Sequence, residues 1–294
     1  MARESRVDDV DGARLVAVRP WARSAGAVPQ MFGYRMPPLP GVHRGLPSPY
    51  LTLVFSLCGD LPIEVPAGIR SRAVAYGIPV GGLHTRPVFL PPITDAAGRH
   101  LPQRGIQLAV NPLAARAIFG MPAGELAGAV LELDEVVGRQ GGELRERLTV
   151  DVAGAQALDQ VRRWIDLRLA ADTRRPAAPE LTRAWRLIVG SGGRLRVSDV
   201  AREVGWSRRH LTARLRAEVG LGAKDLARVS RFQRSRSMMV GSARSLADVA
   251  ADCGYTDQSH LSNEWQEFAG CTPGQWIAAE APALSRLHHH DHHN

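Results

Sequence analysis

Cysteine is scarce in this chain of 294 residues, and its scarcity excludes a disulfide framework. The three cysteines are Cys58, Cys253 and Cys271, an odd number whose spacing matches no metal or redox motif. We therefore expect a reducing, cytoplasmic setting. No run of about 18 apolar residues occurs, so no membrane-spanning helix is predicted. The charged start of the chain also lacks the apolar segment of a signal peptide.

The usual motifs of catalysis are missing as well. Neither a Gly-x-Ser-x-Gly nucleophile elbow nor a P-loop is present. His43, His84 and His100 form no closely spaced pair with a following glutamate, which disfavours a metal site in the first half. Cys58 lies in an apolar segment, where packing is a more common role for a thiol than sensing. We therefore expect no enzymatic activity, no metal and no cofactor.

Lysine is nearly absent, because Lys224 stands alone beside 36 arginines. This bias is typical of GC-rich coding sequences, so arginine content alone is weak support for any function. The distribution of charge is more informative. Residues 1–180 carry a formal charge of +3 and residues 181–294 carry +5, so positive charge is denser in the shorter C-terminal part. This excess of positive charge in the C-terminal part favours a polyanionic partner.

Two stretches of the C-terminal part repeat one another. Val197–Trp206 aligns with Leu246–Tyr255, which places Gly205 and Gly254 49 residues apart. After the turn the offset becomes 50, and three residues of the first copy, Leu211, Leu215 and Gly220, match Leu261, Trp265 and Gly270. Each copy predicts a helix, a tight turn and a second helix, at about 198–218 and 245–268.

Local signals support these units. Ser245 and Asp257 are predicted N-caps of the two helices in the second copy, and Gly254 ends the first of them. The buried stripe of the last helix is formed by Leu261, Trp265 and Phe268. A bridging helix is predicted over 223–239. Together with the closing motif Gly270-x-Thr272-Pro273-x-x-Trp276, these features resemble the DNA-binding domain of AraC/XylS-type transcription regulators, over about 181–279.

The resemblance implies transcription regulation, with double-stranded DNA as the partner. RNA polymerase, a small-molecule effector and a second copy of the chain are further candidate partners, and no membrane partner is expected. In a helix-turn-helix, the start of the second helix meets base edges in the major groove. The predicted DNA-binding residues of the first unit are Arg208, Arg209, Thr212, Ala213 and Arg216. Those of the second unit are Gln258, Ser259, His260 and Asn263.

Alternatives remain open for several polar residues. Arginine can fork onto guanine and asparagine onto adenine, but a solvated helix face would have the same composition. The family often has arginine where this chain has Ala213 and Asn263, so relatives do not give the operator sequence. His210 suits a structural or phosphate-facing role. Candidate phosphate contacts are Arg202, Arg214, Arg231, Arg234 and Arg236.

The preceding residues predict a different architecture. Apolar runs at 50–57, 73–90 and 104–110 predict strands, and many prolines mark turns and edges. The fold class is therefore α+β: an N-terminal β-rich domain with helices, a barrel or sandwich that by resemblance is cupin-like, followed by an all-α tandem helix-turn-helix domain. The predicted boundaries are a first domain at 13–170, a linker at 171–180, a DNA-binding domain at 181–280 and a disordered His-rich tail at 281–294.

The β-rich domain is expected to serve effector binding or dimerisation. Its aromatic residues are candidates either for a small-molecule pocket or for the core: Trp21, Phe32, Tyr34, Phe55, Tyr76 and Phe89. A helix over 154–169 carries an apolar stripe that suits either a dimer coiled coil or packing on its own domain. The sequence thus predicts a DNA-binding regulator whose first domain senses a small molecule or a partner. The alternative is a ligand-independent or partner-controlled regulator.

Overall fold

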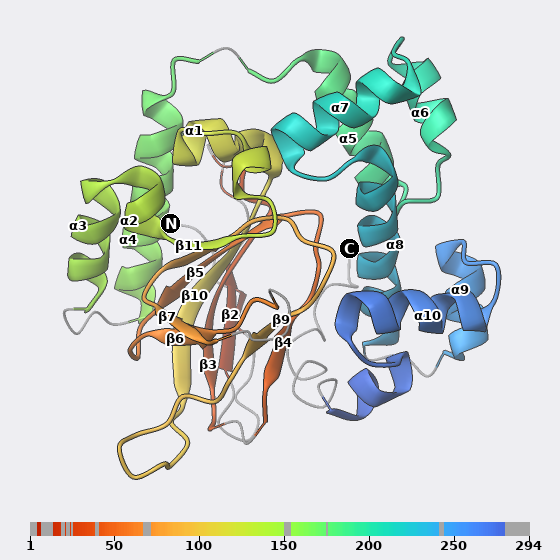
Figure 1. Cartoon of the computed structure of the whole chain (residues 1–294). Coiled ribbons are helices and arrows are strands. Elements are labelled where there is room, and N and C mark those ends of the chain that lie inside the picture. Colours follow the sequence, from red (N-terminus) through yellow and green to blue (C-terminus); the bar gives the residue numbers. More distant parts are fainter. Residues whose placement is uncertain are drawn as a thin grey trace.

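The first part of the chain forms strands and the last part forms helices in the computed structural model, which describes residues 5–6, 14–18, 21, 24, 26–38, 41–66, 72–149, 154–174, 176–240 and 244–279. The sheet lies between α2–α4 on one side and α5–α10 on the other (Figure 1). The predicted α+β class is therefore confirmed. The His-rich tail predicted at 281–294 lies outside the described residues.

Antiparallel strands make up the first part. The seven-stranded sheet has the order β1-β2-β3-β10-β5-β8-β11, and β4-β9 and β6-β7 form two smaller sheets. The strand bounds are Ser5–Arg6 (β1), Arg14–Val18 (β2), Gln30–Met36 (β3), His43–Gly45 (β4), Leu51–Ser56 (β5), Leu61–Ile63 (β6), Val74–Tyr76 (β7), Pro79–Gly81 (β8), Val88–Leu90 (β9), Gln103–Val110 (β10) and Val130–Glu132 (β11). The predicted strand pair at 73–90 is in fact three short strands, one in each sheet.

Short helices follow β10. They are η2 (Pro112–Ala114), α1 (Ala115–Phe119), η3 (Ala123–Leu126), α2 (Leu133–Val137) and α3 (Arg139–Thr149). Asn111 followed by Pro112 predicts a helix start, and Asn111 does cap η2, accepting a hydrogen bond from Leu113 N at 3.0 Å. The sequence of residues 131–137 predicts only a connection, but the structure has the end of β11 and all of α2 there. A capping box between Glu132 and Glu135 holds the start of α2, and so short a helix shows no apolar period.

The apolar stripe of α4 (Gly154–Ala171) packs on the sheet of its own chain. Leu158, Val161 and Ile165 are buried, and a Cβ placed on Gly33 of β3 would lie 3.8 Å from Leu158 Cδ1. The ring of Phe55 meets Trp164 edge-on at 6.5 Å between centroids. Of the two readings of this helix, packing on its own domain is the one confirmed.

Six labelled helices form the C-terminal part: α5 (Pro179–Gly190), α6 (Val197–Glu203), α7 (Arg208–Val219), α8 (Ala223–Met239), α9 (Leu246–Cys253) and α10 (Gln258–Ala269). Residues 273–279 are also helical. Each predicted unit is therefore a helix pair, α6–α7 and α9–α10, and the predicted bridge is α8. Phe232 of α8 packs between Trp265 and Phe268 at 4.7 and 5.3 Å, which joins α10 to the bridge. Within the described residues no helix has the length and apolar character to cross a membrane.

Ile165→Ala should lower the free energy of unfolding by about 2–5 kcal/mol, since Ile165 is fully buried against the sheet and the substitution leaves a cavity. Leu167→Ala, on the same helix, is the matched control. Leu167 is 69% exposed, and its change should stay within about 0.5 kcal/mol. Urea unfolding of both variants measures the difference. Equal losses at the two positions would contradict the packing of α4 described above.

Candidate nucleic-acid interface

The start of α7, the second helix of the first unit, is exposed. Ser207 caps it by accepting a hydrogen bond from His210 N at 3.1 Å. Leu211 and Leu215 are fully buried and fix the rotation of the helix. Of the predicted contacts, Thr212 is half-buried, and the others are exposed: Arg208, Arg209, Ala213 and Arg216. The fold therefore brings the predicted residues of this unit onto an accessible surface.

The start of α10 in the second unit is presented in the same way. Asp257 caps it, accepting from His260 N at 2.7 Å. Leu261 and Trp265 are fully buried. The predicted residues Gln258, Ser259 and Asn263 are exposed and His260 is half-buried. Gly254, at φ +78°, provides the left-handed backbone that ends α9 and makes the tight turn possible.

One histidine in each unit packs on the aromatic residue of the turn. The Trp206 and His210 rings meet edge-on at 4.7 Å, and the Tyr255 and His260 rings at 5.2 Å. His260 Nδ1 also lies 3.3 Å from Thr256 Oγ1. These contacts give both histidines a role in holding the turn, which for His210 is one of the two roles predicted.

The two exposed helix starts differ in charge. The start of α7 carries arginines, whereas the accessible predicted residues of α10 are amides and a hydroxyl.

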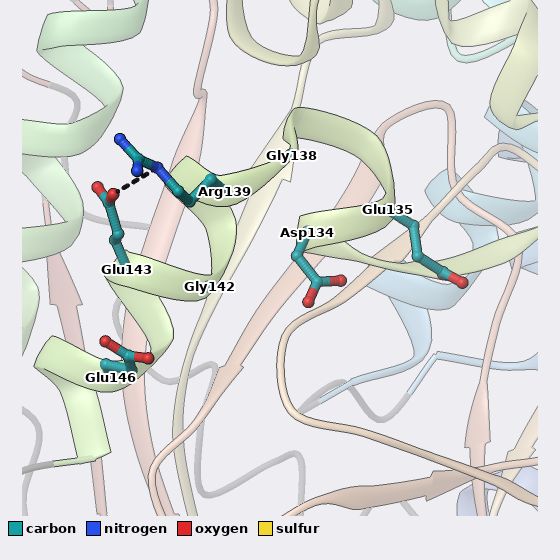
Figure 2. Close-up of a pocket in the computed structure, with 7 residues that line it drawn as sticks. All are labelled: Asp134, Glu135, Gly138, Arg139, Gly142, Glu143 and Glu146. Atoms are coloured by element: carbon teal, nitrogen blue, oxygen red, sulfur yellow. Dashed lines mark ion pairs between the residues drawn. The ribbon is translucent and has the colours of Figure 1, made fainter.

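An open groove of about 570 Å³ lies between α2 and α3 and is lined by carboxylates, with Arg139 paired to Glu143 at 3.1 Å (Figure 2). The remaining acids of this groove are Asp134, Glu135 and Glu146. Such a groove repels phosphate, so it is no candidate surface for DNA.

Two of the candidate phosphate contacts, Arg231 and Arg202, have partners within the chain. Arg231 stacks over the Tyr255 ring at 5.3 Å and donates to Gly193 O at 3.3 Å. Arg202 pairs with Asp199 at 3.1 Å on the exposed surface of α6. Arg231 therefore fastens the second unit to α8 and to the loop before α6, a structural role that the sequence did not suggest.

The β-rich part contacts the far end of α7. Arg116 of α1 forms a two-pronged ion pair with Glu218, through Nε at 2.9 Å and Nη2 at 3.0 Å. The hydrogen bond with Glu218 raises the pKa of Arg116. In η3, Gly124 lies so close to α7 that an added Cβ would sit 2.1 Å from Ala217 O. The contact is therefore backbone against backbone.

Arginines from α4 and the segment after it hold α1 in place. Arg168 Nε donates to Ile118 O at 2.7 Å, and Arg174 Nη1 donates to Arg116 O at 2.7 Å. The bond to Ile118 O satisfies a carbonyl that the helix end leaves unpaired. Arg174 adds a second donor to Arg116 O, which also accepts from Gly120 N. The predicted linker region thus supplies a residue that fastens α1, the same helix that grips α7.

Two further contacts join the β-rich part to the helices. Tyr50 meets Trp185 of α5 edge-on at 5.8 Å, and a Cβ on Gly270, just after α10, would lie 3.7 Å from Pro87 Cγ. The buried apolar side chains of both parts form one connected cluster. The C-terminal ends of α7 and α10 therefore both face the β-rich part, and their starts are left accessible.

The sequence did not predict Arg116, Glu218 or the ion pairs that Arg228 of α8 forms with Glu264 and Glu267 of α10. One signal was available for the latter. Glu264 falls on the buried stripe of α10 between Leu261 and Trp265, and a carboxylate in such a position requires a cation or hydrogen-bond donors. No comparable signal marks Arg116, because its partner is 102 residues away.

Comparison with known proteins agrees with this geometry. Residues 200–279 match the family model described as a helix-turn-helix domain. The C-terminal helices thus belong to the class of helix-turn-helix DNA-binding domains. More particularly, the domain is of the AraC type, which makes the chain a DNA-binding regulator with that domain. Among curated protein sequences, none matches the chain significantly.

One solved structure shares the fold over most of this chain. Apo ToxT from Vibrio cholerae is 12% identical, with a TM-score of 0.51 over 85% of this chain and 97% of that one. A transcriptional regulator with an AraC-type DNA-binding domain, from Chromobacterium violaceum, is 24% identical over 36% of this chain and 92% of that one, with a TM-score of 0.32. The likeness to ToxT shows a shared fold.

Gly124→Ala should loosen the contact between η3 and α7, because its Cβ would overlap the Ala217 carbonyl. We expect a cost of about 1–3 kcal/mol and faster amide exchange at the end of α7. Gly142→Ala in α3 is the control, since nothing lies within 4 Å of its added Cβ. Exchange at the end of α7 that is unchanged in Gly124→Ala would refute a tight contact there.

Proposed function

We propose that the chain is a sequence-specific transcription regulator that reads two adjacent segments of the DNA major groove with the starts of α7 and α10. The observation that carries this proposal is the matched presentation of the two helices. Each begins at a side-chain cap, buries an apolar stripe and leaves its first turns accessible. Helix-turn-helix proteins meet base edges with this part of the second helix.

The side chains suggest different tasks for the two helices. Arg209 is assigned to guanine, which it can hold with two hydrogen bonds, and Asn263 to adenine. Thr212 and Ala213 suit the methyl group of thymine. Arg208 and Arg216 add cationic charge beside the phosphates, whereas Gln258 and Ser259 add uncharged polar groups beside His260. The first helix would then supply much of the salt-dependent affinity, and the second would mainly discriminate sequence.

Arg209→Ala should weaken binding to the cognate site by about 1–3 kcal/mol, with little change on random DNA, if the side chain reads a base. Fluorescence anisotropy with a selected operator and a scrambled duplex measures both affinities. Arg163→Ala is the matched control, because Arg163 is an exposed arginine on α4. An equal loss on both duplexes would make Arg209 a phosphate contact.

We infer that the β-rich part influences the first unit through α1. The Arg116–Glu218 pair and the Gly124 contact connect it directly to α7, and Arg168 and Arg174 join α1 to α4 and the following segment. A change of conformation around α4 would therefore be passed to α7 through directional contacts. A ligand can drive such a change only if it binds the two conformations with different affinity.

The sheet face opposite α4 is the surface we assign to a small effector. Gly33 faces Leu158 of α4, so its neighbours Phe32 and Tyr34 point to the other face of β3. Both are half-buried, and burial raises the pKa of the Tyr34 phenol, which therefore stays neutral. Phe55 packs against Trp164 instead and belongs to the core. A thermal-shift screen with small metabolites tests this assignment, and control by a partner protein is the alternative outcome.

Coupling through α1 can be tested without knowing the effector, because coupling between two sites is reciprocal. Operator DNA should change the hydrogen exchange of residues 112–126 in the wild-type chain. In Arg116→Ala this response should largely disappear, although binding to DNA remains. Arg145→Ala is the control, since it removes a similarly exposed ion pair, with Asp60, away from α7. A response that persists unchanged in Arg116→Ala would rule out this route.

A further inference from the structure

Arg228 of α8 grips α10 through two carboxylates. Its Nε donates to Glu264 Oε1 at 2.8 Å, and its two terminal nitrogens donate to the two oxygens of Glu267 at 3.1 and 2.5 Å. The guanidinium also lies 4.7 Å from the centre of the Phe268 ring. All three nitrogens of the guanidinium are therefore engaged with one turn of α10.

The burial of Glu264 makes its ion pair with Arg228 costly to lose. Glu264 is 4% exposed and lies on the apolar stripe of its helix. A buried carboxylate that loses its cation is strongly unfavourable, and the planar guanidinium can satisfy two carboxylates only in a narrow range of orientations. The hydrogen bond from Arg228 lowers the pKa of Glu267, so that carboxylate is charged in the contact.

Ser235 provides a second directional contact, seven positions further along α8. Its hydroxyl oxygen accepts a hydrogen bond from Trp265 Nε1 at 2.9 Å and donates to Phe232 O at 2.8 Å. Seven positions correspond to about 10 Å along a helix. Two directional contacts at this separation fix the angle between α8 and α10, which apolar packing alone constrains less.

The two units depend on such contacts to different degrees. α7 ends at Val219 and α8 begins at Ala223, so three residues join the first unit to the bridge. Between the end of α8 and the start of α9 there are six residues, 240–245. The shorter connection restricts α7 covalently, whereas the position of α10 relies more on the side chains of α8.

We propose that Arg228, acting through Glu264 and Glu267, is a positioning residue that sets the separation of DNA segments the protein accepts. The proposal rests on the proposed function, namely that α7 and α10 read one operator. Successive major grooves on one face of DNA are about 34 Å apart, so a fixed angle between α8 and α10 restricts the spacing of the two half-sites. Arg228 itself needs no contact with DNA.

The test uses the full chain and operators selected from random DNA by the wild type. Spacers between the two half-sites are lengthened or shortened by one to three base pairs, and each isolated half-site is measured as well. Glu267→Gln is the main variant, because Glu267 has an exposed side chain and its loss should leave the fold intact. Glu203→Gln, which removes an exposed carboxylate paired with Arg183 in the first unit, is the matched control.

We expect the wild type to prefer its best spacing over the next by about tenfold, which equals about 1.4 kcal/mol. Glu267→Gln should reduce this preference to about threefold or less, with half-site affinities within about twofold of wild type. Arg228→Lys should also flatten the profile, because a single ammonium cannot hold both carboxylates in the same geometry. Glu203→Gln should keep the wild-type profile.

Three results would overturn the proposal. One is an unchanged spacing profile in both Glu267→Gln and Arg228→Lys. Another is a loss of half-site affinity as large as the loss on the full operator, which would make Arg228 or Glu267 part of the DNA contact. The third is a wild type with no spacing preference. A wild type that selects no DNA sequence at all would instead refute the proposed function.

Discussion

The far ends of α7 and α10 are both engaged with protein, and this constraint decides which surface is left for DNA. Arg116 and Gly124 occupy the end of α7, while Arg228 and Pro87 lie against the end of α10. The starts of the two helices stay accessible, and a helix start carries unpaired amides and the positive end of the helix dipole. Both properties suit a polyanion, so the domain contacts that position the helices also favour their orientation toward DNA.

Much of the C-terminal fold could be predicted because its signals are local. Ser245 and Asp257 cap the helices that follow them, and Gly254 adopts the left-handed conformation expected at a helix end. Each of these requires only residues within one or two turns, and the repeat supplied a second copy of the turn glycine and of the cap on the second helix. α2 escaped prediction for the opposite reason: a five-residue helix held by its capping box has too few positions to show a period.

Contacts between residues far apart in the chain could not be predicted in the same way. The apolar stripe of α4 predicted which face of the helix is buried, but it did not predict that the sheet around Gly33 covers this face. Arg228 and Glu264 are 36 residues apart, and their meeting depends on the angle at which α10 packs on α8. The candidate DNA contacts were predictable only in part. Their exposure followed from helix periodicity, whereas their partners lie outside the chain and stay a prediction.

The backbone contact between Gly124 and Ala217 also bears on how such a chain can change by recombination. A β-rich part joined to new helices would need a residue without a side chain at this point, because any larger residue overlaps the carbonyl oxygen of α7. The two parts are therefore not freely exchangeable modules, even though the connection between them is short and rich in proline and alanine. Diversification of this regulator would proceed more easily by substitution of the exposed residues at the starts of α7 and α10, such as Arg209 and Asn263.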